Sequence, residues 1–326
     1  MEPYQKEFDM GLSQGQKAMY ALGQCQQAPI TAGFIGAGKV GFSLGKYLRD
    51  NGVSLSGYYS RNAASSQEAA EFTQTKSYSS PEQLLQDSTV IFLTVPDKAI
   101  QQVYQDLSHL PIAGKCLGHC SGSLSSRVFA GARERGARAC SLHPICAISH
   151  KHTGHESLRT AFFTIEGEDV EDIAAIIRQC GNRIESIPAE KKVLYHSAAV
   201  IASNLVVGLY HNATAILSDC GLSGEFSRQA LLPLFMGNAR NIERQGAVAA
   251  LTGPVERGDA TTVADHLRSF SGQQRELYRL LSCQLLELAR QKNPSRDYSA
   301  TERLLTEAAV VCTNKVSDTP DKEDLL

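Results

Sequence analysis

Short apolar runs alternate with segments of helical period along the first 188 residues. We predict strands at Ile30–Ile35, Val53–Tyr59, Lys76–Tyr78, Thr89–Val95, Lys115–His119, Ala137–Leu142, Ala161–Ile165 and Arg183–Ile187. Apolar residues three or four apart predict helices between them, among them Lys39–Asp50, 63–72 and one that starts at Ser80-Pro81. Such alternation forms βαβ units with right-handed crossovers. We therefore expect a doubly wound, mainly parallel α/β domain over residues 29–188.

The pattern changes at Pro188, after which only helical periods occur, near 224–245, 259–270, 273–291 and 297–313. Lys191–Ser218 is predicted as one helix of about 28 residues, or ~42 Å. It is apolar nearly all round and must be covered on most sides, most easily by a second copy of the chain. Asn204, His211 and Asn212 interrupt it, which argues against a membrane span. We expect an all-α domain over residues 189–316 that forms a homodimer.

The two ends differ from this body of the chain. Residues 1–28 form a polar leader, predicted to be flexible, with Glu2, Glu7 and Asp9 where a signal peptide carries positive charge. Residues 317–326 are acidic, contain Pro320 and are predicted to be a disordered tail. The start of the chain thus lacks the features of a signal peptide, which favours a cytoplasmic protein.

The amino-acid composition excludes further classes of protein. Of 326 residues, 42% are hydrophobic and 20% charged, a balance that excludes disorder for most of the chain. Lys and Arg number 32 against 34 for Asp and Glu, so no basic excess favours nucleic acid. The nine cysteines include no CxxC pair, which fits reduced thiols in the cytoplasm.

A glycine-rich loop joins the first predicted strand to its helix. It reads Gly36, Ala37, Gly38, Lys39, Val40, Gly41, a G-x-G-x-x-G pattern. The first glycine permits a tight turn, the second admits a pyrophosphate, and the third lets the helix pack on the strand. The helix N-terminus then presents unpaired N–H groups to the phosphates. The loop therefore predicts a bound dinucleotide.

The end of the second strand bears on which dinucleotide this is. An NAD site carries Asp or Glu about twenty residues after the loop, whereas this chain has Ser60, Arg61 and Asn62. Serine and asparagine can donate hydrogen bonds, and a guanidinium can pair with a 2′-phosphate. NADP(H) is favoured over NAD(H); the alternative is that Arg61 is only a surface charge.

Several motifs together resemble a known family. They are the glycine loop, His119-Cys-Ser-Gly-Ser123, Ser141-Leu-His-Pro144, Tyr195-His196, Ser203-Asn204, and Leu251-Thr-Gly-Pro254 with Arg257-Gly-Asp259. Over roughly residues 29–290 the chain resembles Rossmann-like proteins with a C-terminal domain of unknown function, DUF2520. That family is similar to the 6-phosphogluconate dehydrogenase-like superfamily, which includes pyrroline-5-carboxylate reductase and prephenate dehydrogenase. The resemblance implies an NADP-binding domain, a helical C-terminal domain of 6-phosphogluconate dehydrogenase type and a homodimer, but no substrate.

Thr94, Val95, Pro96 and Asp97 end a strand that is apolar throughout. In a doubly wound sheet, ligands bind beyond the carboxyl ends of the strands. The resemblance implies that Val95 and Pro96 lie near the ribose and nicotinamide. Asp97 can also cap the following helix.

Ser121 with Gly122, and His143, follow or end neighbouring strands and should project over one crevice. The Leu-His-Pro-Ile segment is similar to one in prephenate dehydrogenase whose histidine engages the reacting hydroxyl. His143 could then be a general acid or base in contact with substrate, and Ser121 could orient substrate or the nicotinamide amide. The alternative is a histidine that only bonds a carbonyl at a strand end.

The long helix carries Lys192, His196 and Asn204 along one face. β-Hydroxyacid dehydrogenases have a catalytic lysine there with an asparagine four residues later. Here His196 stands four residues after Lys192, which puts a lysine mechanism in doubt. His196 and Asn204 are the predicted polar pair facing the cofactor; alternatively, they satisfy each other in a dimer core.

Two further segments are weighed for chemistry. The resemblance places Thr252–Asp259 beside the substrate, where Arg257 could hold a carboxylate; the alternative, which we favour slightly, is a connection capped by Asp259. The cluster His143, Cys146, His150, His152 and His155 matches no common zinc spacing, so we predict no metal.

The function predicted is that of an NADP(H)-dependent oxidoreductase. Hydride would pass to or from a small carbonyl, imine or hydroxy compound between the two domains, with His143 or His196 handling the proton. The alternative is a non-catalytic NADP(H)-binding sensor or interaction protein on the same scaffold.

Overall fold

The computed structural model describes residues 29–107 and 109–314. The predicted leader, residues 1–28, and the predicted tail, residues 317–326, lie outside this range. The chain divides into two compact units, Met1–Val200 and Ile201–Leu326.

The first unit is built on one eight-stranded sheet. Its strands are β1 (Thr31–Ile35), β2 (Ser54–Tyr59), β3 (Lys76–Ser77), β4 (Val90–Leu93), β5 (Cys116–His119), β6 (Arg138–Ile145), β7 (Phe162–Gly167) and β8 (Ile184–Ser186). Their order is β3-β2-β1-β4-β5-β6-β7-β8, and every pair is parallel except β6 with β7. The predicted doubly wound, mainly parallel α/β fold is confirmed.

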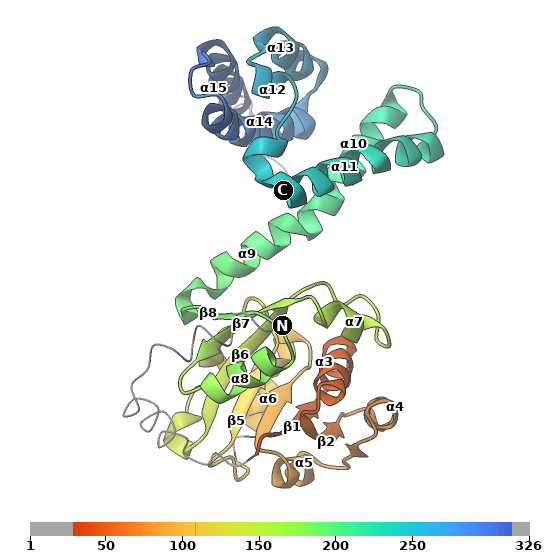
Figure 1. Ribbon diagram of the computed structural model, residues 1–326, viewed down its shortest axis with the longest axis vertical. Helices are drawn as coiled ribbons and strands as arrows, with labels where there is room; N and C mark the ends of the chain where they lie inside the picture. The colour runs from red at the N-terminus through yellow and green to blue at the C-terminus, as the bar shows by residue number, and fades with distance from the viewer. Residues whose placement is uncertain (1–28, 108, 315–326) are drawn as a thin grey trace, which may run out of the picture. The chain divides into compact units, whose positions relative to one another are not determined.

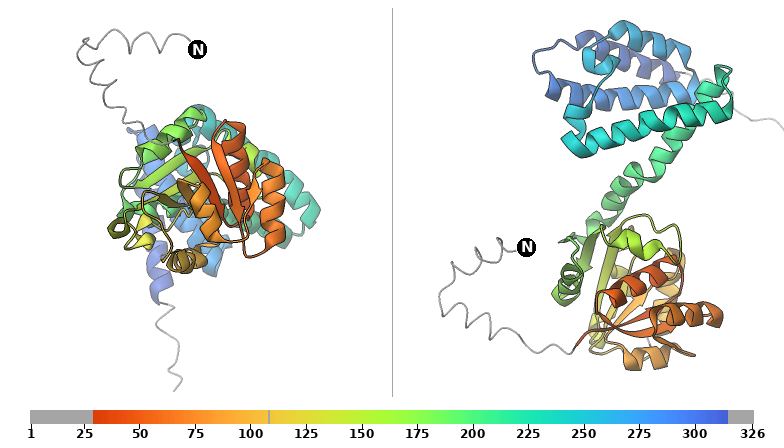
Figure 2. Two further views of the ribbon diagram at one scale, coloured as in Figure 1. Left: turned by 90° about the horizontal axis from the view of Figure 1, so that it is seen from below. Right: turned by 45° about the vertical axis from the view of Figure 1, so that its right-hand side comes forward.

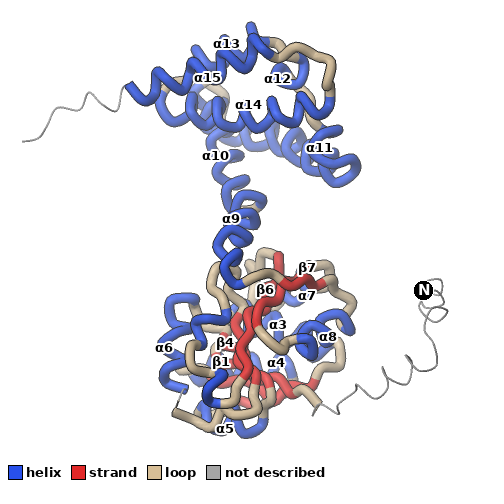
Figure 3. Tube along the Cα trace, turned by 90° about the vertical axis from the view of Figure 1, so that its left-hand side faces the viewer, coloured by secondary structure: helices blue, strands red, loops and turns tan. Residues whose placement is uncertain are grey.

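Helices cover both faces of this sheet (Figure 1). One face carries α3 (Lys39–Asp50), α4 (Ala63–Thr73), α7 (Gly154–Leu158) and α8 (Glu171–Gln179), whose apolar residues form one core with Phe34, Tyr58 and Phe163. The other carries α5 (Pro81–Asp87), α6 (Asp97–Leu107) and the short 3-10 helices η1 (Ser126–Phe129) and η2 (Arg133–Arg135). In Figure 3 the sheet lies between α6 on one side and α3, α4 and α8 on the other.

The second unit is helical throughout its described residues. It contains α10 (Asn204–Asp219), α11 (Gly224–Ala250), α12 (Pro254–Arg257), α13 (Ala260–Ser269), α14 (Gly272–Lys292) and α15 (Ser299–Asn314). Helices α10 and α11 pack side by side (Figure 2). A small core packs the residue after α11 against α13, α14 and α15. It includes Leu251, Val263, Leu286 and Leu305. The all-α prediction for this part is confirmed.

The single helix predicted over Lys191–Ser218 is wrong in one respect. A 3-10 turn, η3 (Ala189–Lys191), leads into α9 (Lys192–Ala202), and Ser203 interrupts the helix before α10, with φ −126° and ψ −79°. The Ser203 hydroxyl donates to Asn204 Oδ1 at 3.1 Å. Serine and asparagine side chains compete with helical backbone bonds, which explains the break at this pair.

The apolar surface of this segment stays uncovered within one chain. Val193, Leu194, Leu205 and Val207 are each more than half exposed. By length and composition alone, Ala189–Asp219, with mean hydropathy 1.5, could also cross a membrane. One such helix is weak support for a membrane protein, because a helix buried between subunits has the same composition.

Candidate functional site

The glycine loop after β1 is shaped by close contact with the end of β4. Gly36 has φ 104°, and a Cβ there would lie 2.9 Å from the Thr94 carbonyl oxygen. A Cβ on Gly41 would lie 2.3 Å from Thr94 Oγ1 and 2.6 Å from the Gly36 oxygen. Thr94 Oγ1 donates to that same oxygen at 2.7 Å. Only glycine fits at positions 36 and 41, so the turn and the close helix packing are both present.

The second glycine borders open space. A Cβ on Gly38 would come no nearer than 3.9 Å to any neighbour. Gly38 is the N-cap of α3, receives no side-chain cap bond, and the first turn holds no acid. Ala37 is buried, whereas Lys39 is exposed at the start of the helix. The uncapped N–H groups and a partly positive helix end fit a dinucleotide pyrophosphate.

The residues after β2 include an arginine whose side chain is exposed to solvent. Ser60 is half-buried and Arg61 is exposed, and no ion pair joins Arg61 to the part of the chain that is described. Asn62 caps α4, its Oδ1 accepting from the Ala64 N–H at 3.1 Å. A free guanidinium at this strand end is compatible with a 2′-phosphate.

The loop after β5 is held by its own polar groups. Ser121 Oγ donates to Asp97 Oδ2 at 2.6 Å and accepts from the Leu124 N–H at 3.1 Å. Buried His119 receives the Ser121 N–H on Nδ1 at 3.2 Å and faces the Ser125 carbonyl through Nε2 at 3.2 Å. Burial lowers the pKa of His119 to about 4. The Ser121 hydroxyl thus already organises the loop, and orienting a ligand would require one of these bonds to open.

A buried lysine supports this loop from α9. Lys192 is 1% exposed, and its Nζ donates to the Ser121 carbonyl at 3.0 Å and to Ser141 Oγ at 2.8 Å. Burial lowers the pKa of Lys192 to about 8, while Glu166, Cys120 and Asp97 oppose that shift. The ammonium therefore binds the loop to β6.

His143 is bonded through one ring nitrogen. Its Nδ1 lies 2.7 Å from the Tyr195 hydroxyl, which also receives a bond from Thr164 Oγ1 at 3.0 Å. Burial, and then the charges of Lys192, His196 and His119, lower the pKa of His143 to about 4. The imidazole is neutral at physiological pH.

The two predicted histidines meet at Gly122. A Cβ on Gly122 would lie 2.3 Å from His196 Nδ1 and 2.9 Å from His143 Nε2. The rings are 6.0 Å apart and nearly perpendicular. His196 Nδ1 is buried without a hydrogen-bond partner among the described residues. Such an atom is costly to bury, so it fits a place where a ligand supplies the missing bond.

Two further predicted residues, Val95 and Pro96, lie between β4 and α6. Val95 is half-buried and Pro96 is exposed. Val40 lies in the first turn of α3. Each follows the carboxyl end of β1 or β4, as predicted, and their contact with a cofactor stays a prediction.

Two predicted residues belong to the second unit. Asn204 begins α10, and Arg257 is exposed at the end of α12. Asp259 caps α13 by accepting from the Thr262 N–H at 3.0 Å, as the capping alternative predicted. The roles of Asn204 and Arg257 at a site remain predictions.

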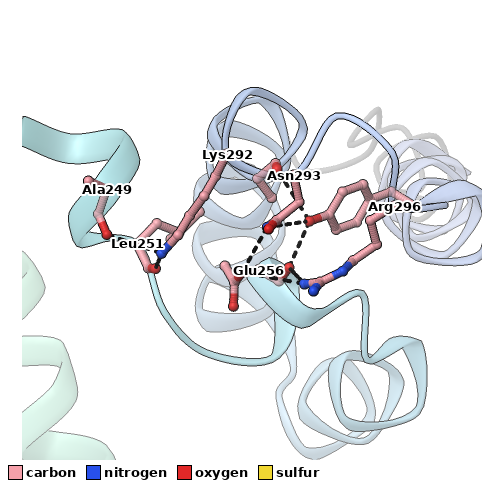
Figure 4. Close-up of polar contacts among 8 residues, drawn as sticks. Ala249, Leu251, Glu256, Lys292, Asn293 and Arg296 are labelled. Carbon is pink, nitrogen blue, oxygen red and sulfur yellow. Dashed lines mark hydrogen bonds and ion pairs between the residues drawn. The ribbon is translucent and has the colours of Figure 1, made fainter.

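Polar contacts fix the segment that carries Arg257 (Figure 4). Glu256 Oε1 accepts from Asn293 Nδ2 at 2.7 Å and from Arg296 at 3.3 Å. Lys292 Nζ donates to the Ala249 and Leu251 carbonyls at 3.1 and 2.6 Å. Glu256 therefore ties the Thr252–Asp259 connection to the end of α14 and the residues that follow it.

The histidines that follow His143 pack on other groups. His152 Nε2 lies 3.1 Å from Glu68 Oε1, and its ring contacts Phe42 edge-on. His155 contacts the Phe72 ring in the same way. Within residues 29–107 and 109–314, no group of three or more His, Cys, Asp or Glu side chains is arranged to hold a metal ion.

A cavity of about 720 Å³ lies elsewhere in the first unit. It is lined by η1, η2 and the ends of β7 and β8, and Arg127 and Glu190 form an ion pair at its edge. None of the predicted site residues lines it. We assign it no role in the predicted chemistry.

Sequence reasoning gave no role to Tyr195 and Thr164, and expected no buried function for Lys192. Tyr195 was visible only as part of a family motif, and Thr164 as one residue of an apolar strand. For Lys192, the only signal of a buried role was its position near the start of an apolar helix. Their meeting depends on the antiparallel pairing of β7 with β6, in which His143 lies opposite Thr164.

Comparison with known families agrees with this architecture. The model for a Rossmann-like domain matches residues 16–144, and that for the domain of unknown function DUF2520 matches residues 161–285. The chain carries both domains, which confirms the resemblance. No curated protein matches the chain.

Solved structures extend the comparison. Protein TM1727 from Thermotoga maritima is 28% identical with TM-score 0.66, over 80% of this chain and 99% of that one. BF3122 from Bacteroides fragilis, described as a candidate NADP oxidoreductase, is 25% identical with TM-score 0.59, over 79% and 98%. A Plasmodium falciparum pyrroline carboxylate reductase with NADP bound is 17% identical with TM-score 0.52, over 81% and 97%, and shows the shared fold alone. The chain has the fold of Rossmann-type oxidoreductases.

Proposed function

We propose that the protein is an NADP(H)-dependent oxidoreductase acting on a small carbonyl, imine or hydroxy compound. The observation that carries this proposal is the pair of imidazoles at Gly122, with the unpartnered His196 Nδ1 beside His143 Nε2. A dinucleotide loop alone fits a sensor equally well. A buried polar atom without a partner among the described residues, close to a second imidazole on β6, favours a reacting ligand. The likeness to a candidate NADP oxidoreductase from Bacteroides fragilis supports the class.

The residues present suit the cofactor. Gly36, Gly38 and Gly41 with the α3 N-terminus would hold the pyrophosphate, and Arg61 the 2′-phosphate. The bound nicotinamide supplies or accepts hydride. His143 and His196 would contact the substrate, because one nitrogen of each ring packs against the same residue, Gly122.

The Arg61 assignment is tested by changing its charge. Arg61→Asp should weaken NADPH binding at least tenfold while NADH binding changes little, because only NADPH carries the 2′-phosphate. Isothermal titration with each nucleotide measures this. Arg159→Asp, an equal change at another exposed arginine, should leave both affinities unchanged. Equal NADPH and NADH binding by the unaltered protein would remove the NADP assignment.

Catalysis is tested separately with a panel of keto acids, aldehydes, imines and hydroxy acids. Oxidation of NADPH by at least one substrate, lost in His143→Gln, is expected. Tight NADPH binding with no turnover of any of them would instead favour the non-catalytic sensor.

We also propose that two copies associate through the apolar surfaces of α9, α10 and α11 and that the protein acts in the cytoplasm. The exposed apolar side chains of these helices support the first point. The fold of soluble oxidoreductases supports the second.

A further inference from the structure

A chain of hydrogen bonds from Thr164 through Tyr195 reaches Nδ1 of His143 and orients its ring. Thr164 Oγ1 on β7 donates to the Tyr195 hydroxyl on α9 at 3.0 Å, and that hydroxyl lies 2.7 Å from His143 Nδ1 on β6. Burial raises the pKa of Tyr195, so the phenol keeps its proton. With Thr164 donating to the phenol oxygen, the phenol can donate its own proton to Nδ1.

This direction fixes the tautomer of the imidazole. A neutral histidine has one N–H, and a nitrogen that accepts a hydrogen bond leaves that proton on the other nitrogen. When the phenol donates to Nδ1, His143 Nε2 carries the proton. His143 is only partly buried, and its Nε2 packs closely against Gly122, where a Cβ would lie 2.9 Å from it. The group presented to a ligand there is a hydrogen-bond donor.

The charged group that acts most strongly on His143 is the Lys192 ammonium. Buried His119, whose pKa is about 4, is neutral at physiological pH. Asp97 accepts from Ser121 Oγ, Glu166 accepts from the Ser126 N–H and hydroxyl, and neither carboxylate is among the groups that shift the pKa of His143. The Lys192 charge therefore favours a negative oxygen at Nε2 over a cation.

We propose that Tyr195 is a positioning residue that holds His143 with Nε2–H toward the substrate, and that the substrate presents a ketone or aldehyde oxygen there, not an imine nitrogen. This inference rests on the proposed oxidoreductase function. A carbonyl oxygen accepts the Nε2–H bond, and the bond strengthens as the oxygen gains negative charge. A protonated imine would set a positive N–H against another N–H.

The reaction balances as follows. The carbonyl carbon gains a hydride, for which a reduced nicotinamide dinucleotide is the reductant, and the π pair of the C=O bond moves onto oxygen. A proton from water completes the alcohol. His143 stabilises the oxygen without a net change in its own protonation.

The tautomer is tested without cofactor or turnover. Nitrogen-15 NMR at pH 7.5, with the His143 signals assigned by their loss in His143→Gln, should show a protonated Nε2 and an unprotonated Nδ1. Tyr195→Phe should give a mixture of tautomers. Tyr104→Phe removes a buried hydroxyl that donates to the Ala130 carbonyl, and it should leave the His143 signals unchanged. A protonated Nδ1 in the unaltered protein, or no response to Tyr195→Phe, overturns the positioning role.

Substrate class is tested with matched ketones, aldehydes and stable cyclic imines, after NADPH binding has been measured by titration. Turnover of carbonyl compounds is expected, with kcat at least tenfold lower in Tyr195→Phe and little change in KM. Turnover of imines alone, or of neither class, overturns the substrate assignment. Absence of NADPH binding would instead remove the proposed function itself, so the two failures are distinguishable.

Discussion

Burial of two histidines beside a buried lysine makes the stability of this protein depend on pH. His143 and His119 both have a pKa near 4, below the ordinary 6.5, with burial as the largest cause. Each binds a proton more tightly when unfolded. Their contribution to stability is present above pH 6.5 and lost as pH falls from 6.5 toward 4.

For His143 this loss can be measured by substitution. Between pH 7.5 and 5.0 the unaltered protein should lose about 1–2 kcal/mol more unfolding free energy than His143→Gln does, because glutamine does not titrate. Urea titrations followed by circular dichroism at the two pH values measure the difference. His109→Gln, at an exposed histidine, should keep the full loss. An equal loss in the unaltered protein and His143→Gln would contradict a buried neutral imidazole.

At the scale of elements, the β1-α3-β2 unit depends on close packing of helix on strand. Gly45, inside α3, faces Tyr58 on β2, and a Cβ there would lie 1.8 Å from the Tyr58 hydroxyl and 2.9 Å from the ring carbon that bears it. Helix propensity favours alanine over glycine by about 1 kcal/mol. The clash opposes this gain, since a buried tyrosine ring between Phe34 and α3 has little room to move.

Gly45→Ala should therefore destabilise the protein by about 1–3 kcal/mol despite its better helix propensity. Tyr58→Phe removes the hydroxyl, so the double variant should recover part of that loss. The midpoints of urea unfolding for both single variants and the double variant measure the coupling. A stabilised Gly45→Ala protein would show that α3 is not packed this closely.

At the scale of the whole molecule, most of the exposed large apolar side chains of the described residues lie on α9, α10 and α11. Val207 is 69% exposed and Leu234 is 64% exposed. Exposed apolar surface of this extent marks an interaction surface. A second copy of the same chain would bury it by symmetry.

Analytical sedimentation at micromolar concentration should thus show a dimer. Leu234→Glu should raise the dissociation constant of this dimer at least tenfold. Phe162→Glu, at a half-exposed residue of β7, is the matched control and should remain dimeric. A monomer at all concentrations, or association only in the presence of lipid vesicles, would contradict the dimer.

Local patterns were sufficient for most of the fold. The helix Lys39–Asp50 was predicted to the residue, and β1, β2 and β4 were placed within a residue or two, because a period of two or near 3.6 and a glycine or proline at the ends are local properties. The break at Ser203 was missed, since a polar pair inside a long apolar run weakens a helix only slightly by propensity.

The sequence by itself determined the parallel α/β sheet, the glycine loop and the helical second half, because each follows from neighbouring residues. Only the tertiary structure decided what His143 can do. Its bond to Tyr195, the support of Tyr195 by Thr164, and the binding of Lys192 to the Ser121 loop join residues 31 to 71 positions apart. Such contacts depend on strand order and on which side chains are buried together, and no local pattern specifies them.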